Sequence, residues 1–324
     1  MKAIRIEQNG GPEVLRLVDI DAPKPGPRQV RIRAEAIGVN FIDTYYRTGL
    51  YAVSLPSGLG QEAAGIVDAI GAEVTRFKVG DRAAYGGGPV LGAYAEQHVL
   101  DETRVVHLPD AISFDIAASA MLKGMTARYL LRKTFPVQPQ QVVLIHAAAG
   151  GVGQIAVQWA KHLGATVIAS VGSDAKAEIV RALGADHVLV TSRDDIAKSV
   201  REITKGEGVH VVYDGVGKDT WDASLDCLRQ RGMMVSYGNA SGPPPPLNLL
   251  TLSQKGSLFV TRPTLFNYTA TVADLEETAA DLFDALARGA VKVKPPMRYK
   301  LADAAQAHRD LEGRKTVGSL VLTP

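Results

Sequence analysis

The sequence predicts an α/β protein in which a doubly wound parallel sheet is joined to a second, β-rich domain. Two observations carry this prediction. Apolar strands alternate with amphipathic helices through the middle of the chain, and a glycine-rich turn lies between the first of these strands and its helix. With 324 residues, 46% of them hydrophobic and 22% charged, the chain has the composition of a globular protein of about two domains.

Residues 1–122 read as short strands separated by Gly and Pro. Val30–Ala36 and Gly65–Ile70 have strand character, and turn signals such as Pro25-Gly26 lie between such runs. This pattern predicts a compact β-rich barrel or sandwich as the first domain.

Residues 123–264 alternate between strands and helices. Val142–Ile145 is a continuous apolar run, as expected for a parallel strand buried on both faces. The helix that follows has one apolar stripe, and Gly164 is placed to end it. The other predicted strands are Thr166–Ser170, His187–Val190, Val209–Tyr213, Met233–Ser236 and Leu258–Thr261, and the other helices are Lys176–Leu183, Ile196–Ile203 and one ending at Leu225. Six strands with intervening helices predict a dinucleotide-binding sheet.

Residues 265–324 form the last segment. It contains an amphipathic helix near Leu275–Leu286 and ends in the apolar run Ser319–Leu322. We expect this segment to return to the first domain.

The glycine-rich turn is Ala147-Ala148-Ala149-Gly150-Gly151-Val152-Gly153. Gly150 lets the backbone approach a pyrophosphate, Gly153 lets the helix pack close to the sheet, and the helix N-terminus offers N–H groups to phosphates. We assign to cofactor binding the residues Ala149, Gly150, Gly151, Val152 and Gly153. Ala148 stands where the usual pattern has its first glycine. The alternative is a glycine-rich turn without a ligand.

The end of the second predicted strand favours NADPH over NADH. A carboxylate there would bind the ribose 2′-hydroxyl, but the strand Thr166–Ser170 ends without one. Ser173 and Lys176 can bind a 2′-phosphate, and we expect Asp174 to point outward. The alternative for Lys176 is a solvated helix residue.

Charge and cysteine content exclude several classes. Lys and Arg number 36 against 34 Asp and Glu, a net charge of +2 without a basic block, which gives no support for a nucleic-acid or membrane partner. The single cysteine, Cys227, excludes an intrachain disulfide and a cysteine-rich metal site.

The first residues of the chain alternate polar and apolar side chains like a strand, and they lack the features of a signal peptide. We expect a cytoplasmic protein.

Six motifs follow one another along the chain. They are Asn40–Asp43, Gly60–Gly65, Lys123–Ala127, the glycine-rich turn, Tyr213–Gly217 and Gly313–Gly318. On these motifs the chain resembles, over essentially its whole length, the quinone oxidoreductase (zeta-crystallin-like) family of the medium-chain dehydrogenase/reductase superfamily. The resemblance implies a GroES-like catalytic domain over residues 1–122, an NADPH-binding Rossmann domain over 123–264, and a returning segment over 265–324.

The resemblance also indicates that zinc is absent. Alcohol dehydrogenases of this superfamily hold zinc with a cysteine and a histidine at the positions where this chain has Asn40 and Gln61, neither of them a usual zinc ligand. Without a Lewis acid the substrate should accept hydride readily, as a quinone or an activated double bond does.

The resemblance implies that Asn40, Tyr45 and Tyr51 line the nicotinamide and substrate cleft. An asparagine amide can bind the cofactor or a substrate oxygen, and a tyrosine can hydrogen-bond a quinone oxygen or donate a proton. The alternative is that the two tyrosines only pack at a domain boundary. The proton donor stays open between tyrosine and water, and transfer of single electrons stays open beside hydride transfer.

Four further cofactor contacts are implied. Thr126, Gly238 and Arg314 should touch the cofactor, although Arg314 can equally be a surface ion pair. Ser192 stands where relatives that prefer NADPH commonly carry a tyrosine. Since serine cannot stack, the adenosine end should bind more loosely unless Arg193 compensates.

Two other functions stay open: reduction of the carbon–carbon double bond of enals or enones, and a non-catalytic role in nucleotide or RNA binding. The modest net charge argues against RNA, and a nucleotide-binding fold alone does not prove catalysis. Lys255–Thr261 should be the edge strand of the sheet and invites a two-fold homodimer. Otherwise the chain's own tail covers that edge.

Overall fold

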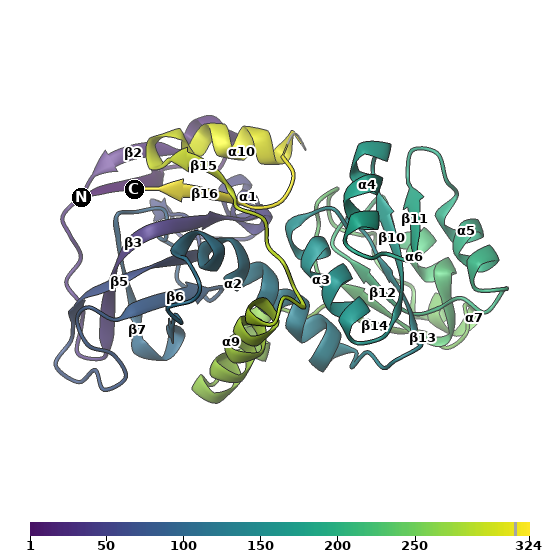
Figure 1. Cartoon of the computed structure of the whole chain (residues 1–324). Helices are drawn as coiled ribbons and strands as arrows, with labels where there is room; N and C mark the ends of the chain where they lie inside the picture. The colour runs from purple at the N-terminus through teal and green to yellow at the C-terminus, as the bar shows by residue number, and fades with distance from the viewer. Residues whose placement is uncertain (314–315) are drawn as a thin grey trace. The chain divides into compact units, whose positions relative to one another are not determined.

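The computed structural model describes residues 1–313 and 316–324 (Figure 1). The chain divides into two units. Unit 1 comprises Met1–Met125, Tyr268–Ala287 and Val293–Pro324, and unit 2 comprises Thr126–Asn267 and Arg288–Lys292.

Unit 2 contains the predicted six-stranded parallel sheet, in the order β11-β10-β9-β12-β13-β14. Its strands are β9 (Val142–Ile145), β10 (Thr166–Val171), β11 (His187–Val190), β12 (Val209–Asp214), β13 (Leu228–Ser236) and β14 (Phe259–Thr261). The prediction of a doubly wound sheet is confirmed. The strand order reverses between β9 and β12, and ligands of such sheets bind at the carboxyl ends of the strands near this point.

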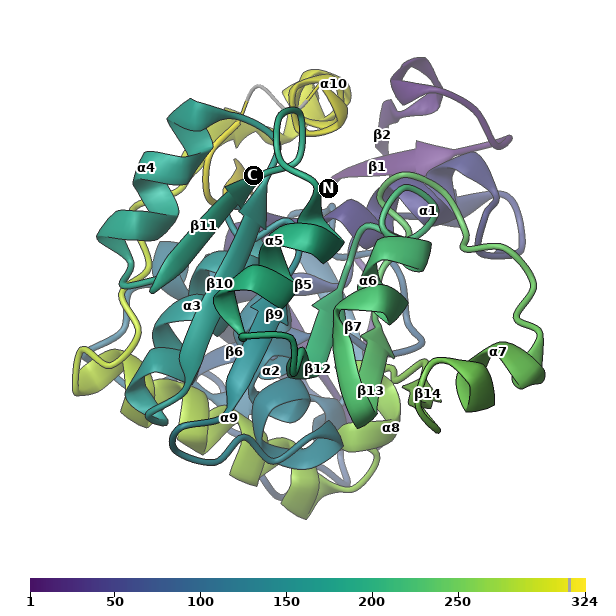
Figure 2. The ribbon, with the colours of Figure 1, turned by 90° about the vertical axis from the view of Figure 1, so that its right-hand side faces the viewer.

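Helices α3 (Gly151–His162), α4 (Asp174–Ala182), α5 (Ile196–Ile203) and α6 (Trp221–Cys227) pack on this sheet (Figure 2). Unit 2 also contains the short helices α7 (Leu249–Gln254) and α8 (Leu265–Tyr268, whose last residue belongs to unit 1), and a π-helical turn spans Leu130–Thr134. Val200 of α5 and Trp221 of α6 share a buried cluster with Leu144 and Val212 of the strands. The periodic apolar positions read from the sequence therefore face the sheet.

Unit 1 is β-rich, as predicted. A sheet of seven strands runs β15-β16-β3-β5-β6-β8, with β7 also paired to β3, and a smaller sheet runs β2-β1-β4. The strands are β1 (Lys2–Ile6), β2 (Arg16–Asp19), β3 (Gln29–Val39), β4 (Ser57–Gly58), β5 (Glu62–Ile70), β6 (Arg82–Gly86), β7 (Gln97–Asp101), β8 (Val106–His107), β15 (Met297–Lys300) and β16 (Leu320–Thr323).

The last strand, β16, pairs antiparallel with β3 (Figure 1), so the end of the chain belongs to the large sheet of unit 1. The longer helices of unit 1 are α1 (Phe41–Thr48), α9 (Val272–Ala287) and α10 (Ala304–Glu312), with short 3-10 turns at Pro12–Val14, Glu102–Arg104 and Leu301–Asp303. Helix α2 (Phe114–Tyr129) begins in unit 1 and ends in unit 2.

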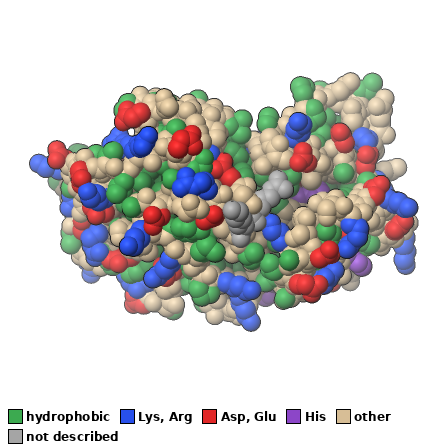
Figure 3. Space-filling view, turned by 90° about the horizontal axis from the view of Figure 1, so that it is seen from above, with side chains coloured by type: hydrophobic (Ala, Val, Ile, Leu, Met, Phe, Trp, Pro, Cys, Tyr) green, Lys and Arg blue, Asp and Glu red, His purple; other side chains and the backbone are tan. Residues whose placement is uncertain are grey.

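Acidic and basic side chains are interspersed on the face seen in Figure 3, in keeping with the net charge of +2. Among the described residues, no helix has the length and apolar character needed to cross a membrane.

Candidate active-site residues and nucleotide-binding loop

Helix α1 begins directly after Asn40, whose backbone is extended, and ends at Gly49, which adopts a left-handed φ of 82°. The Asn40 N–H donates to Oδ2 of Asp43 over 2.8 Å. This caps the first turn and fixes where the helix starts. Asp43 is therefore a capping carboxylate of α1.

The side chain of Asn40 is held by a buried ion pair. Its Nδ2 donates to Oε2 of Glu62 over 2.7 Å, and Nζ of Lys123 lies 3.5 Å from the same oxygen. Glu62 is 0% and Lys123 6% exposed. Burial raises the pKa of Glu62, against the opposing effects of the Lys123 ammonium and the Asn40 amide. Glu62 and Lys123 each lie in a motif found in the sequence, Gly60–Gly65 and Lys123–Ala127, but the sequence does not show that the two side chains form an ion pair.

Asp43 is a second buried carboxyl group next to Asn40. Burial raises its pKa to about 7, although the Asn40 N–H, the Tyr94 hydroxyl and the Lys123 ammonium oppose the shift. Its Oδ1 has no hydrogen-bond partner among the described residues. Asn40 is therefore anchored through its backbone by one buried carboxyl group and through its amide by another.

The predicted tyrosines lie in an aromatic cluster on α1 and the loop after it. The Tyr45 ring meets the rings of Phe41 and Tyr51 edge to face, with centroids 5.7 and 5.2 Å apart, and Tyr46 meets Tyr51 at 5.6 Å. Tyr45 is buried and Tyr51 is half-buried. Unit 1 thus brings Tyr45 and Tyr51 together through packing contacts. These contacts fit the alternative of structural tyrosines as well as a substrate-binding role.

The residues at the superfamily's zinc positions do not fit zinc. The amide of Asn40 is engaged with Glu62, and Nε2 of Gln61 donates to the Gly88 carbonyl. Cys227 lies in unit 2, where burial raises the pKa of its thiol to about 12. Within residues 1–313 and 316–324 no three His, Cys, Asp or Glu side chains are grouped so as to hold a metal ion.

The glycine-rich turn in unit 2 has the geometry of a phosphate loop. A Cβ on Gly153 would lie 2.6 Å from the Ala147 carbonyl oxygen and from the Cα of Ala148, so only glycine allows this approach of α3 to the loop. A Cβ on Gly150 would have a single neighbour, the Ala147 oxygen at 3.1 Å, and would otherwise face open space. Gly150 is thus the position where a bound group can approach the backbone.

A buried polar network underlies this loop, and the sequence did not reveal it. His146 precedes the loop. Its Nδ1 lies 2.6 Å from the Ser170 hydroxyl and its Nε2 3.0 Å from the Ser224 hydroxyl. Asp214, at the end of β12, accepts from Ser224 and Thr220 and from the N–H groups of Val216 and Gly217. The network therefore ties together the loops that follow β9 and β12.

The residues predicted to bind the 2′-phosphate lie at the same edge of the sheet. Ser173 is the N-cap residue of α4, and Lys176, in the first turn of α4, is half-buried. Asp174 points outward, as predicted, and pairs with Arg193 over 2.9 Å with 77% of its side chain exposed. This ion pair connects the first residue of α4 to the loop after β11, in which Ser192 is exposed.

Of the remaining predicted contacts, Thr126 and Gly238 both lie in unit 2. Thr126 is buried on α2, and Gly238 follows β13, packed so closely that a Cβ would lie 2.4 Å from the Gly215 oxygen. Arg314 lies outside the described residues. Their roles in cofactor binding stay predictions.

Comparison with known proteins identifies the family. A family model described as the alcohol dehydrogenase GroES-like domain matches residues 26–110, and one described as zinc-binding dehydrogenase matches residues 151–284. A quinone oxidoreductase of Pseudomonas aeruginosa is 55% identical over 100% of this chain and 99% of its own. A 2-haloacrylate reductase of a Burkholderia species is 46% identical over 98% of each chain.

Solved structures agree with this similarity. The crystal structure of Escherichia coli quinone oxidoreductase complexed with NADPH matches with a TM-score of 0.98 and 48% identity, and the match covers 100% of both chains.

Proposed function

Because the chain belongs to the quinone oxidoreductase family of the medium-chain dehydrogenase/reductase superfamily, we propose that it reduces quinones with NADPH and without a metal ion. The observation that carries the proposal is the loop at Gly150, which faces open space between a buried strand and a helix N-terminus. When bound there, NADPH supplies a hydride from its nicotinamide ring. Residues 123–264 then hold the nucleotide, and residues 1–122 with the segment 265–324 act on the acceptor.

The nucleotide is held by three groups of residues in this proposal. Backbone N–H groups of Ala149–Gly153 bind the pyrophosphate. Ser173, Lys176 and Ser192 face the 2′-phosphate, and the absence of a carboxylate at the end of β10 leaves room for it. Thr126, Gly238 and Arg314 complete the set by family resemblance. Arg193 is already paired with Asp174 and Asp194, so it has to leave those partners to compensate for Ser192.

The acceptor is bound by residues of unit 1. The Asn40 amide uses one N–H on Glu62, which leaves the second N–H as a donor. The hydroxyl groups of Tyr45 and Tyr51 can donate to a quinone oxygen. Since Asn40 and Gln61 do not fit zinc, these donors replace a Lewis acid, and the acceptor must be one that hydride reaches without metal activation.

A second candidate is reduction of an activated carbon–carbon double bond. One observation favours it: the 46% identical relative is a 2-haloacrylate reductase. An acrylate carries its double bond next to a carboxylate, and the same cofactor and hydride chemistry serve it.

We also propose a homodimer formed through the edge of the unit 2 sheet. Strand β14 ends the strand order, and Phe259 on it is 56% exposed. Helix α7, which precedes β14 in the chain, exposes two further apolar side chains, Leu249 at 74% and Leu250 at 59%. The described end of the tail pairs with β3 instead of β14. Phe259→Asp should give monomers in sedimentation, whereas Val79→Asp, at a 59% exposed valine of unit 1, should leave the assembly unchanged. A dimeric Phe259→Asp protein would contradict the proposal.

A cytoplasmic location is part of the proposal. Its support is the single thiol of Cys227, which is buried and forms no disulfide.

The test is oxidation of NADPH and of NADH, followed by loss of nicotinamide absorbance, with benzoquinone and with an α,β-unsaturated ketone as acceptors. Each assay runs with and without a chelator. We expect rapid, chelator-insensitive oxidation of NADPH by the quinone. Activity with the enone alone would support the second candidate, and NADPH binding without turnover would refute a catalytic function.

A further inference from the structure

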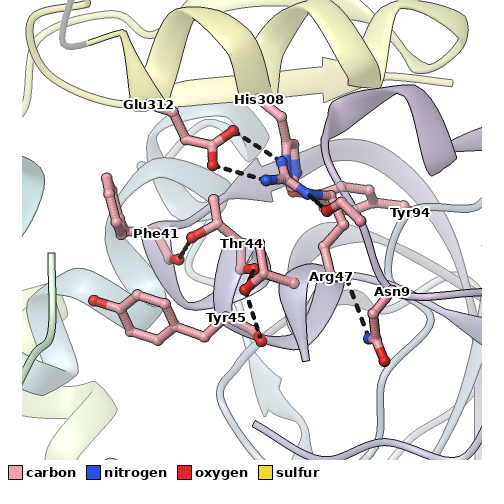
Figure 4. Close-up of polar contacts among 10 residues, drawn as sticks. Asn9, Phe41, Thr44, Tyr45, Arg47, Tyr94, His308 and Glu312 are labelled. Atoms are coloured by element: carbon pink, nitrogen blue, oxygen red, sulfur yellow. Dashed lines mark hydrogen bonds and ion pairs between the residues drawn. The ribbon is translucent and has the colours of Figure 1, made fainter. Parts of the chain in front are cut away.

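A continuous chain of buried side chains joins α1 to α10 in unit 1 (Figure 4). Nη1 of Arg47 lies 2.9 Å from Nδ1 of His308, and Nε2 of His308 lies 3.0 Å from the Tyr94 hydroxyl. The Tyr94 hydroxyl donates to Oδ2 of Asp43 over 2.8 Å. These four side chains, which we call the Asp43 chain, are at most 1% exposed.

The chemistry of the donors fixes the direction of every bond. A guanidinium group only donates, so Nδ1 of His308 accepts from Arg47. Burial and the Arg47 charge lower the pKa of His308 to about 3, so the imidazole is neutral and carries its hydrogen on Nε2. That hydrogen is donated to the Tyr94 oxygen, and the only hydroxyl hydrogen of Tyr94 goes to Asp43. The donations from Arg47 to His308, from His308 to Tyr94 and from Tyr94 to Asp43 therefore all run toward the Asp43 carboxyl group.

The other end of the Asp43 chain is anchored near the surface. Arg47 makes a bidentate contact with Glu312, in which Nη1 donates to Oε2 over 2.9 Å and Nη2 donates to Oε1 over 2.7 Å. Its Nε donates to the Gly10 carbonyl oxygen over 3.0 Å. Such a bidentate pair fixes the plane of the guanidinium group. Glu312 is the last residue of α10, so the end of that helix is tied to α1.

We propose that the Asp43 chain is a positioning device for the proposed reaction: its hydrogen bonds favour the ionised form of Asp43, and the anion holds the backbone of Asn40 in place. The amide of Asn40 is thereby set for the acceptor or the cofactor. An isolated carboxyl group with no exposure would be neutral. The Tyr94 hydroxyl and the Asn40 N–H, both donating to Oδ2, favour the anion. The inference rests on the proposed function for its kinetic readout.

The charged and titratable groups that face Asp43 come from several elements. Lys123 on α2 favours the anion, Glu62 on β5 opposes it, and Tyr46 lies near on α1. Removing the Tyr94 hydroxyl takes away a donor that lowers the pKa of Asp43 and leaves these other groups in place. The pH at which Asp43 gains its proton must then rise.

The experiment compares Tyr94→Phe with Tyr85→Phe. Tyr85 is also buried and hydrogen-bonded to a histidine, His98 at 2.9 Å, but lies outside the Asp43 chain. The readout is the pH dependence of kcat/KM for benzoquinone at saturating NADPH. We expect the midpoint of the acid limb to rise by about one pH unit in Tyr94→Phe, as for loss of one hydrogen bond to a carboxylate, and to stay unchanged in Tyr85→Phe.

A second variant, Asp43→Asn, keeps the shape of the side chain and removes its titration. We expect its acid limb to disappear, and an acid limb that survives would overturn the proposal, as would a folded Tyr94→Phe protein with the wild-type midpoint. The titration of Asp43 is read separately from the carboxyl infrared band that Asp43→Asn deletes. A wild-type protein without turnover would refute the proposed function, while an infrared midpoint that fails to move in Tyr94→Phe would refute the Asp43 chain.

Discussion

Replacing Gly153 by alanine should damage both stability and nucleotide binding. The new Cβ would lie 2.6 Å from the Ala147 oxygen and the Ala148 Cα, both backbone atoms that cannot rotate away. Ordinary contact requires a separation larger by about 1 Å, so α3 must shift from the loop by roughly that amount, and overpacking of this kind costs about 1–3 kcal/mol. The shift also displaces the N–H groups at the start of α3, which should weaken NADPH binding about tenfold.

Gly150→Ala is the matched control, because its Cβ meets only one atom, at 3.1 Å. Its φ of −76° suits alanine. Chemical unfolding and titration of the protein's fluorescence with NADPH separate the two effects. We expect Gly150→Ala to retain wild-type stability within about 0.5 kcal/mol and to lose affinity because its methyl group enters the phosphate position. Equal stability of Gly153→Ala and wild type would refute the packing argument, and wild-type NADPH affinity in Gly150→Ala would refute the placement of the phosphates.

Three further outcomes are expected. In the fluorescence titration, Lys176→Met should raise the Kd for NADPH about tenfold and leave the Kd for NADH nearly unchanged. Lys198→Met, at an exposed lysine of α5, should change neither Kd. Glu62→Leu leaves the Lys123 ammonium buried without its partner and should cost about 3 kcal/mol in urea unfolding, much of which Lys123→Met should restore. His98→Gln should flatten the acid side of the plot of unfolding free energy against pH. Burial lowers the pKa of His98 to about 4, so below pH 6.5 the unfolded chain binds a proton that the folded protein does not. The wild-type protein should therefore lose about 3 kcal/mol of unfolding free energy between pH 6.5 and pH 4, and the variant should not.

The elements of unit 2 were predictable because each is coded locally. A short continuous apolar run such as Val142–Ile145 is typical of a strand covered on both faces, and its boundaries match β9. Strand β13 was predicted too short, at Met233–Ser236. Its first residues, Leu228–Arg231, are polar outside Leu228, and Leu228 pairs with Val209 before an irregularity in the ladder with β12. Local periodicity does not record such a long-range pairing.

The candidate site was predictable only where a motif carried it. Asn40 and the glycine-rich turn stand in recognisable segments, whereas the partners that hold them do not. His308 lies 261 residues after Arg47, and as a sequence letter it reads as an ordinary helix residue. Glu62 and Lys123 sit in the motifs but 61 residues apart, and nothing in either segment states that they form one buried ion pair.

The two units place their buried polar groups by the same physical logic. In unit 1, Asp43 and Glu62 hold Asn40; in unit 2, Asp214 and His146 hold the loops at the carboxyl edge of the sheet. A buried polar or charged group is costly unless it is hydrogen-bonded, so displacing the partners of these groups is unfavourable and the network resists displacement. The loops above it are then fixed before a ligand arrives, which reduces the ordering cost of binding. Polar residues in these cores are therefore better explained by the position of the site than by stability alone, because apolar substitutes would pack as well but would leave Asn40 and the phosphate loop without their anchors.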